Sequence, residues 1–202
     1  INKGPQFTTT MLNYDTTKFP FDRVEVRQAV SLAVDRQDLA DTVYLGGATP
    51  GSSGWIHPNS PFFNSAVVTK TDVDAAKALL DGINATDTNG DGIRELDGQP
   101  LSMEMLTPSN DSLRLRVAEL VREMLLQIGI DAKVASVEQA TWEAKIWPDF
   151  DVSKGRDYQL GVWGWSAPVQ ADTGQIAQLV HSDPVVGSIN LTGFSDPETD
   201  QL

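Results

Sequence analysis

A strand–helix–strand unit constrains the fold of this chain more than any other feature. Residues 101–107 and 131–137 are predicted strands. Residues 110–128 between them are a predicted helix, because apolar residues recur three and four apart and Asn110 or Asp111 can cap its start. The apolar positions are Leu113, Val117, Leu120, Val121, Met124, Leu125 and Ile128. Two strands joined by a helix form a parallel crossover, so the chain is expected to build an α/β layer.

Further elements are predicted on either side of this unit. Strands are expected at residues 8–13 and 158–165, and helices at residues 24–44, 71–80, 138–147 and 173–180. The helix at residues 24–44 carries its apolar side chains mostly on one face, and Gly46 and Gly47 stop it. Strands separated by helices predict an α/β fold with a mixed central sheet flanked by helices.

The composition argues against several classes of protein. A formal net charge of −13 and a pI near 4.4 disfavour nucleic acid or an anionic membrane surface as the partner. The absence of cysteine removes disulfides, thiolate nucleophiles and cysteine-bound zinc. No apolar run approaches the length of a membrane-spanning helix. We therefore expect a globular protein that neither binds nucleic acid nor spans a membrane.

The acidic segment at residues 87–97 has oxygen-bearing side chains at alternating positions and a glycine at the sixth, as an EF-hand-like calcium loop needs. The candidate ligands are Asp87, Asn89, Asp91, the Ile93 carbonyl, Glu95 and, one place early, Asp97. The twelfth position, where a bidentate glutamate is usual, is Gly98. A tight β-hairpin turn built from turn-forming residues is the alternative. No cofactor is expected to be required, and a structural calcium ion is the one candidate.

The predicted strand at residues 158–165 is rich in tryptophan. Alternation places Trp163 and Trp165 on one face of the strand. Open α/β sheets bind ligands at the carboxyl ends of their strands, where the Trp165 ring would stack on a peptide or a sugar. The alternative is that both rings belong to the core. The loop at residues 48–64, rich in glycine and proline, adds Trp55 as a further candidate.

An enzymatic alternative comes from the sequence GWSAP at residues 164–168. It approaches the nucleophile elbow of α/β hydrolases, with Ser166 as the nucleophile of a serine hydrolase. Proline replaces the second glycine of that motif, and the only histidines, His57 and His181, fit the order of a catalytic triad poorly. No P-loop, dinucleotide-binding glycine motif or HExxH zinc motif is present. Binding rather than catalysis is therefore expected.

Five stretches, in order and spacing, resemble one family. They are residues 19–36 (FPFDRVEVRQAVSLAVDR), 75–80 (AAKALL), 118–134 with QIGI, 158–165 (YQLGVWGW) and 193–200 (GFSDPETD). This pattern is similar to the family-5 extracellular solute-binding proteins, which are the dipeptide, oligopeptide, nickel and oligosaccharide receptors of ABC importers. The resemblance implies a periplasmic-binding-protein-like clamshell of two lobes. Residues 1–202 would be its carboxy-terminal lobe, without the amino-terminal lobe and the final helices.

The resemblance also implies a function. It predicts a receptor that delivers peptides or related small solutes to the membrane permease of an ABC transporter. Such a receptor is expected to be a monomer in the periplasm or outside the cell, lipid-anchored in its full-length form. An oligosaccharide receptor and a ligand sensor without transport remain the alternatives.

Single residues receive roles from the same resemblance. It implies a structural role for Arg27. In peptide-binding relatives, an aspartate three residues after the tryptophan that corresponds to Trp165 pairs with the amino terminus of the ligand. In this chain Pro168 occupies that position. Asp172 could replace it if the loop is rearranged, so the ligand stays open between peptide and oligosaccharide. The expected ligand-binding residues are Trp163, Trp165, Ser166, Asp172 and Trp55.

Overall fold

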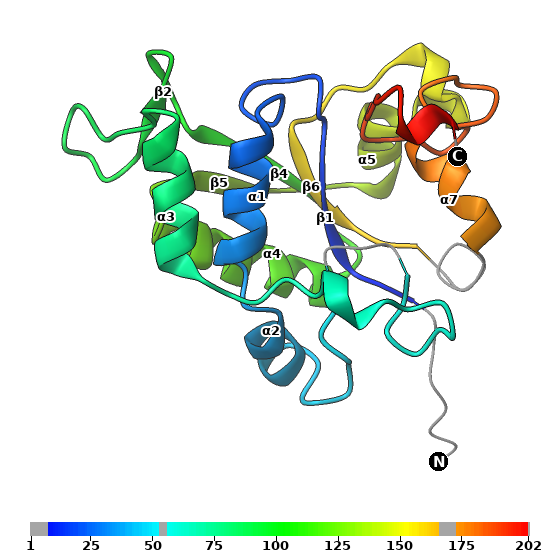
Figure 1. Cartoon of the computed structure of the whole chain (residues 1–202), viewed down its shortest axis with the longest axis horizontal. Helices are drawn as coiled ribbons and strands as arrows, with labels where there is room; N and C mark the ends of the chain where they lie inside the picture. Colours follow the sequence, from blue (N-terminus) through cyan, green and yellow to red (C-terminus); the bar gives the residue numbers. More distant parts are fainter. Residues whose placement is uncertain (1–7, 53–55, 166–172, 202) are drawn as a thin grey trace.

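In the computed structural model, which describes residues 8–52, 56–165 and 173–201, a four-stranded sheet lies at the centre of the chain (Figure 1). The strand order is β1 (Met11–Tyr14), β6 (Leu160–Trp163), β4 (Ser102–Pro108) and β5 (Asp131–Val137). Strand β4 runs parallel to β5 and β6, whereas β1 runs antiparallel to β6. The predicted mixed sheet is confirmed.

The parallel strands β4 and β5 are joined by α4 (Ser112–Leu126), which confirms the predicted strand–helix–strand unit. Asp111 caps this helix, because its Oδ1 accepts the N–H of Arg114 at 3.0 Å. Gly129 ends the turn after the helix with a φ of +80°, which glycine adopts at little cost. Six of the seven predicted core positions of the helix are buried. Leu113 is the exception at 49% exposed, because it lies in the first turn beside a surface cavity.

Two apolar cores lie on opposite faces of the sheet. Met105 of β4 belongs to the larger core and the next residue, Leu106, to the smaller one. Helices α1 (Val24–Ala33) and α3 (Val73–Gly82) lie side by side (Figure 1) and pack with α4 in the larger core. Helix α5 (Gln139–Ile146) covers the smaller core. On β6, Val162 joins the larger core and Trp163 the smaller one, so the predicted alternation is confirmed.

The prediction of one helix over residues 24–44 is wrong, because this segment forms two helices, α1 and α2 (Arg36–Thr42). Val34 and Asp35 between them have an extended backbone. Oδ1 of Asp35 accepts the N–H groups of Gln37 and Asp38, each at 3.0 Å. An aspartate that caps a new helical start offers the backbone an alternative to continuing the first helix. The apolar periodicity continues across Val34 and Asp35, so it predicted one uninterrupted helix.

Shorter elements complete the fold. Strands β2 (Glu95–Leu96) and β3 (Gln99–Pro100) form a separate hairpin. The remaining helical segments are η1 (Ser65–Val67), η2 (Pro148–Phe150), η3 (Val152–Lys154), η4 (Thr173–Gln175), α7 (Ile176–Val180) and η5 (Thr199–Gln201).

Most remaining predicted elements are present with shifted ends. The predicted helices at residues 71–80 and 138–147 are α3 and α5. The predicted helix at residues 173–180 contains η4 and the short α7, and the strand at residues 158–165 shortens to β6. The strand predicted at residues 8–13 begins later, as β1. Within the described part of the chain, no helix has the length and apolar character needed to cross a membrane.

Candidate functional site

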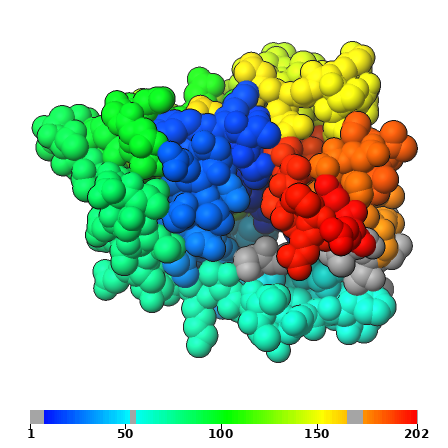
Figure 2. Space-filling view, turned by 45° about the horizontal axis from the view of Figure 1, so that its top comes forward, coloured from blue at the N-terminus to red at the C-terminus, as the bar shows by residue number. Residues whose placement is uncertain are grey.

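A cavity of about 1300 Å³ opens along β1. Figure 2 shows the surface hollowed between the N-terminal elements in blue and the carboxy-terminal segment in red. The wall combines β1 and the residues before it, parts of α1 and α2, the first turns of α4, and Leu179, Thr192 and Phe194. Segments distant in the sequence thus surround one space, which is large enough for a small solute.

The cavity reaches the carboxyl edge of the sheet. The antiparallel register pairs Met11 with Trp163, so the residues just before β1 lie beyond the carboxyl end of β6. The N–H of Thr9 donates to the carbonyl of Trp165 at 3.1 Å, and Thr9 lines the cavity. Asp111 and Arg114, which follow the carboxyl end of β4, line it as well. This edge is where open α/β sheets bind ligands.

Two tyrosines, Tyr14 and Tyr44, are part of the cavity wall. Oη of Tyr44 lies 2.8 Å from Oγ1 of Thr10. The Tyr14 ring stacks on Phe21 with centroids 4.8 Å apart. Burial raises the pKa of Tyr14 to about 12, against a smaller opposing effect of two nearby arginines. The Tyr14 hydroxyl therefore stays neutral at physiological pH and can donate to or accept from a polar ligand atom.

Arg27 and Arg36 bring positive charge to the same wall, but protein groups hold both side chains. Nη1 of Arg27 donates to the Phe21 carbonyl at 2.6 Å. Arg36 donates to the carbonyl and to Oγ of Ser31, at 2.9 and 2.8 Å. Burial lowers the pKa of Arg36. These contacts tie both guanidinium groups to the two ends of α1, which supports the structural role that the resemblance implies for Arg27.

Trp163, one of the expected ligand-binding residues, is only 2% exposed and so presents almost no surface to a ligand. Its ring packs edge-on against Trp142 and Tyr158, with centroids 5.5 and 5.3 Å apart. The ring also lies over Gly161, where a Cβ would come within 2.5 Å of it. For Trp163 the core alternative therefore describes the structure.

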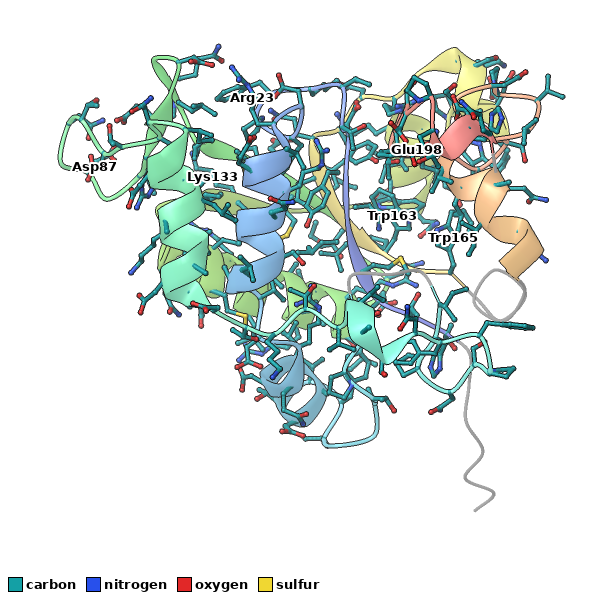
Figure 3. The ribbon with its side chains drawn as sticks, viewed as in Figure 1. Arg23, Asp87, Lys133, Trp163, Trp165 and Glu198 are labelled. Atoms are coloured by element: carbon teal, nitrogen blue, oxygen red, sulfur yellow. The ribbon has the colours of Figure 1, made fainter. Side chains whose placement is uncertain are left out.

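Trp165 is half-buried and packs against the smaller core. Its ring meets Trp147 edge-on at a centroid distance of 6.2 Å. The carbonyl of Trp165 accepts the N–H of Thr9, which lines the cavity. Trp165 itself is not among the described residues that line the cavity. Figure 3 shows Trp163 and Trp165 close together, in the half of the molecule that contains α7. A role of Trp165 in ligand binding stays a prediction.

Trp55, Ser166, Pro168 and Asp172 lie outside the described residues, so the structure does not place these predicted residues. The two histidines of the hydrolase alternative, His57 and His181, are among the described residues. Nδ1 of His57 accepts the N–H of Asn59 at 3.0 Å, and burial lowers the pKa of His57. Nδ1 of His181 accepts the N–H of Asp183, also at 3.0 Å. Each imidazole thus holds a local turn through Nδ1.

The acidic loop brings three of its predicted ligands together. One carboxylate oxygen from each of Asp87, Asp91 and Glu95 lies within 4.8 Å of the others. Nδ2 of Asn89 donates to Asp91 and Glu95 at 3.2 and 3.0 Å. The Asn89 amide N–H group thus lies among the three carboxylates, whose negative charges would favour a cation there. Figure 3 shows Asp87 at the end of the molecule remote from Trp163 and Trp165.

Backbone hydrogen bonds fix the shape of this loop. Asp87 accepts the N–H of Gly92 at 2.9 Å and that of Gly90 at 2.7 Å. These two bonds, with the Gly92 bond the larger cause, lower the pKa of Asp87. Oδ1 of Asp91 accepts the N–H of Ile93 at 2.8 Å. The loop is therefore held in one shape by its own backbone, and the Ile93 carbonyl stays a predicted ligand.

Asp97 does not belong to the acidic group. Its carboxylate pairs with Arg23 at 2.6 Å, at the start of α1. Asp97 and Gly98 both have positive φ and form the turn between β2 and β3. A hairpin is therefore present, but it turns at Asp97 and Gly98, at the end of the segment 87–97 for which a hairpin turn was the alternative. The prediction that Asp97 is a calcium ligand is wrong, because its carboxylate pairs with Arg23 instead.

The sequence analysis missed the polar residues that line the cavity. Thr10 and Tyr44 are paired although they are far apart in the chain. Tyr14 and Ser31 also line the wall, and neither was a candidate ligand-binding residue. Only the tertiary structure brings them to one wall, so no local pattern could have indicated them.

The α/β layer and the cavity at its carboxyl edge are features of a ligand-binding lobe. The chain matches the profile of the bacterial extracellular solute-binding proteins, family 5 middle region, over residues 1–185. The chain belongs to this family.

Two curated relatives illustrate the similarity. The chain is 32% identical to the nickel-binding periplasmic protein of Escherichia coli K12 over 138 residues, which are 68% of this chain and 26% of that protein. It is 30% identical to the oligopeptide-binding protein AppA of Bacillus subtilis 168 over 188 residues, covering 90% of this chain and 32% of AppA. The chain thus spans about a third or less of the length of these relatives.

A solved structure shows the same fold. The structure of AppA from Bacillus subtilis in complex with a nonapeptide superposes with a TM-score of 0.80 at 26% identity, and covers 96% of this chain and 37% of AppA. A Thermotoga maritima oligopeptide ABC transporter protein with bound mannohexaose gives a TM-score of 0.80 at 20% identity, which concerns the fold alone.

Proposed function

We propose that this chain is the carboxy-terminal lobe of a receptor that captures a peptide or a related small solute outside the cytoplasm. The receptor passes the solute to the membrane permease of an ABC importer, and it acts as a monomer without catalysis. The observation that carries the proposal is the large cavity at the carboxyl edge of the sheet in a chain of this family. The similarity to a nickel-binding and an oligopeptide-binding protein supports the class of ligand.

A ligand screen tests this proposal. The receptor, at the full length of its relatives, is mixed with di- to pentaalanine and with glucose and mannose oligomers of two to six units. We expect at least one peptide to raise the unfolding temperature, because a ligand that binds only the folded state stabilises it. Binding of the sugars alone would establish the oligosaccharide alternative. A protein that binds no member of either set would favour a sensor for another signal and would contradict solute capture of this kind.

Trp165→Ala tests the proposed ligand contact in the same receptor. We expect the substitution to weaken binding of the best panel member by about 1–3 kcal/mol, the range for losing a large buried contact. Isothermal titration calorimetry measures the effect. Trp163→Phe is the matched control, since Trp163 is buried in the smaller core. Normal binding by the folded Trp165→Ala protein would assign this ring to the core as well.

We also propose a structural calcium ion for the loop that contains Asp87, Asp91 and Glu95. The proposal is supported by the three carboxylates within 4.8 Å and by the spacing of the loop. Three close negative charges repel one another, and a divalent cation would relieve that repulsion. The ion would stabilise the fold and take no part in ligand capture, because Asp87 lies at the end of the molecule remote from Trp163 and Trp165 (Figure 3).

Calcium titration of metal-free protein tests this site. At 100-fold excess over Kd a bound ion adds about 2.7 kcal/mol, which raises the unfolding temperature by about 5–10 °C for a chain of this size. Asp91→Asn should abolish most of that rise. Asp97→Asn is the matched control, because Asp97 pairs with Arg23 outside the carboxylate group. If calcium leaves the unfolding temperature of the unmodified protein unchanged, the loop binds no calcium and is only a turn.

A further inference from the structure

We propose that Trp147 is a positioning residue for the solute site, because its ring sets the orientation of the Trp165 ring. This inference rests on the proposed function. The two rings meet edge-to-face, with centroids 6.2 Å apart and planes at 75°. Edge-to-face contact is a preferred geometry for aromatic pairs and contributes beyond the apolar area that it buries. Trp165 is half-buried, so the contact with Trp147 limits the rotation of a ring that the core only partly encloses.

Trp147 is itself held firmly at the end of α5. Its N–H donates to the Glu143 carbonyl at 2.8 Å, which closes the last turn of the helix. Pro148 follows and begins η2, and its ring restricts the backbone at the helix end. The Trp147 ring also meets Phe150 edge-on, with centroids 5.3 Å apart. Backbone and ring contacts therefore leave Trp147 little freedom.

A double connection fixes the end of α5 to the segment that leads into β6. The N–H of Asp157 donates to the Lys145 carbonyl at 2.7 Å. Nζ of Lys145 also pairs with the Asp157 carboxylate at 3.0 Å. Lys145 lies just before Trp147, and Asp157 lies just before β6, the strand that ends beside Trp165. The helix and the strand are thus joined close to the aromatic pair, so their relative placement is defined.

The same helix supplies a matched pair for comparison. Trp142, one turn earlier on α5, meets Trp163 at 5.5 Å. The indole N–H groups of both Trp142 and Trp147 are buried without a hydrogen-bond partner among the described residues. The two tryptophans of α5 therefore have similar surroundings and differ in the ring that they contact. Trp142 supports a ring of the core, whereas Trp147 supports the half-buried ring at the strand end.

A double-mutant cycle in the full-length receptor tests the inference, with the tightest-binding member of the alanine-peptide and oligosaccharide panel as the probe. Trp147→Ala should weaken binding by about two- to tenfold, the range of one aromatic pair. The same substitution should have no further effect in the Trp165→Ala background, because Trp147 acts through Trp165. Trp147→Phe keeps an aromatic edge and should restore most of the affinity. Trp142→Phe should leave the affinity unchanged.

A readout independent of ligand accompanies the cycle. The emission of Trp165 is obtained as the difference between each protein and its Trp165→Phe counterpart, with acrylamide as the quencher. Trp147→Ala should make Trp165 more accessible to acrylamide, whereas Trp142→Phe should not. Additive effects on binding, or unchanged quenching in the folded Trp147→Ala protein, would overturn the positioning role. If no probe binds the unmodified receptor, the proposed function fails, and the quenching experiment still decides whether Trp147 orients Trp165.

Discussion

Two glycines of the segment around β6 determine where its tryptophans lie. A Cβ on Gly161 would stand 2.5 Å from Cζ3 of Trp163, so this glycine makes room for the buried ring. A Cβ on Gly164 would collide with the carbonyl oxygen of Thr9, so the second glycine permits the close approach of the residues before β1. The tryptophans were singled out in the sequence, but it is Gly161, two positions before Trp163, that allows the Trp163 ring to be enclosed.

Replacing Gly161 with alanine should destabilise the protein by about 1–3 kcal/mol, the usual cost of forcing extra volume into a packed core. The added methyl group meets the rigid ring of Trp163, which Trp142 and Tyr158 hold in place. Urea unfolding measures the change. Gly82→Ala is the matched control, because a Cβ there meets nothing within 4 Å and Gly82 ends a helix. Equal stabilities of the two variants would contradict the close packing at Gly161.

Among the elements, those with agreeing local signals were predicted best. Helix α4 has apolar periodicity, an aspartate cap and a terminal glycine, and all three agree with the structure. The α1–α2 segment has equally good periodicity but contains Asp35, whose capping role gave a conflicting local signal. Periodicity reports which residues face a core, and two helices that share one core can continue the same pattern. The break was therefore predictable only from the capping chemistry of one residue.

The cap at Asp35 can be tested directly. Asp35→Ala should cost about 1 kcal/mol, because the N–H groups of Gln37 and Asp38 lose their acceptor at the start of α2. Asp35→Asn keeps an oxygen acceptor and should retain most of the stability. Thermal unfolding followed by circular dichroism compares the two variants. A loss of stability as large in the asparagine variant as in the alanine variant would show that charge, and not capping, matters at this position.

At the scale of the whole molecule, the α/β fold was predictable whereas the cavity was not. The crossover between β4 and β5 follows from local patterns, and it fixes an α/β layer. The cavity, by contrast, is assembled from β1, α2, the first turns of α4 and the carboxy-terminal segment. Its polar contacts, such as Thr10 with Tyr44, depend on long-range packing. The carboxyl-edge rule predicted a ligand site at the edge of the sheet that the cavity reaches, and the wall residues emerged only from the tertiary structure.

The distribution of charge predicts how the molecule responds to acid. Hydrogen bonds and ion pairs lower the pKa of several carboxylates below the reference value of 3.8. The main causes are the backbone N–H of Gly92 for Asp87, the Lys145 ammonium group for Asp157 and the Ser182 hydroxyl for Asp200. Because the pKa values of these groups are lower in the folded state, their stabilising contribution is present above the reference value. It is lost as the pH falls through their folded-state pKa values.

We therefore expect the unfolding temperature to fall as the pH is lowered below 3.8. A second effect acts in the same direction, because the net charge of −13 at pH 7 reaches zero near the pI of 4.4, so below 3.8 the chain is positive and repels itself more strongly as the pH falls. Salt at about 0.5 M screens that long-range repulsion far more than the close pairs, so melting curves in high salt isolate the local contribution. Asp157→Asn, which removes the ion pair with Lys145, should make the decline shallower. An unfolding temperature that stays constant or rises on acidification in high salt would show that the local contacts of these carboxylates contribute nothing to stability.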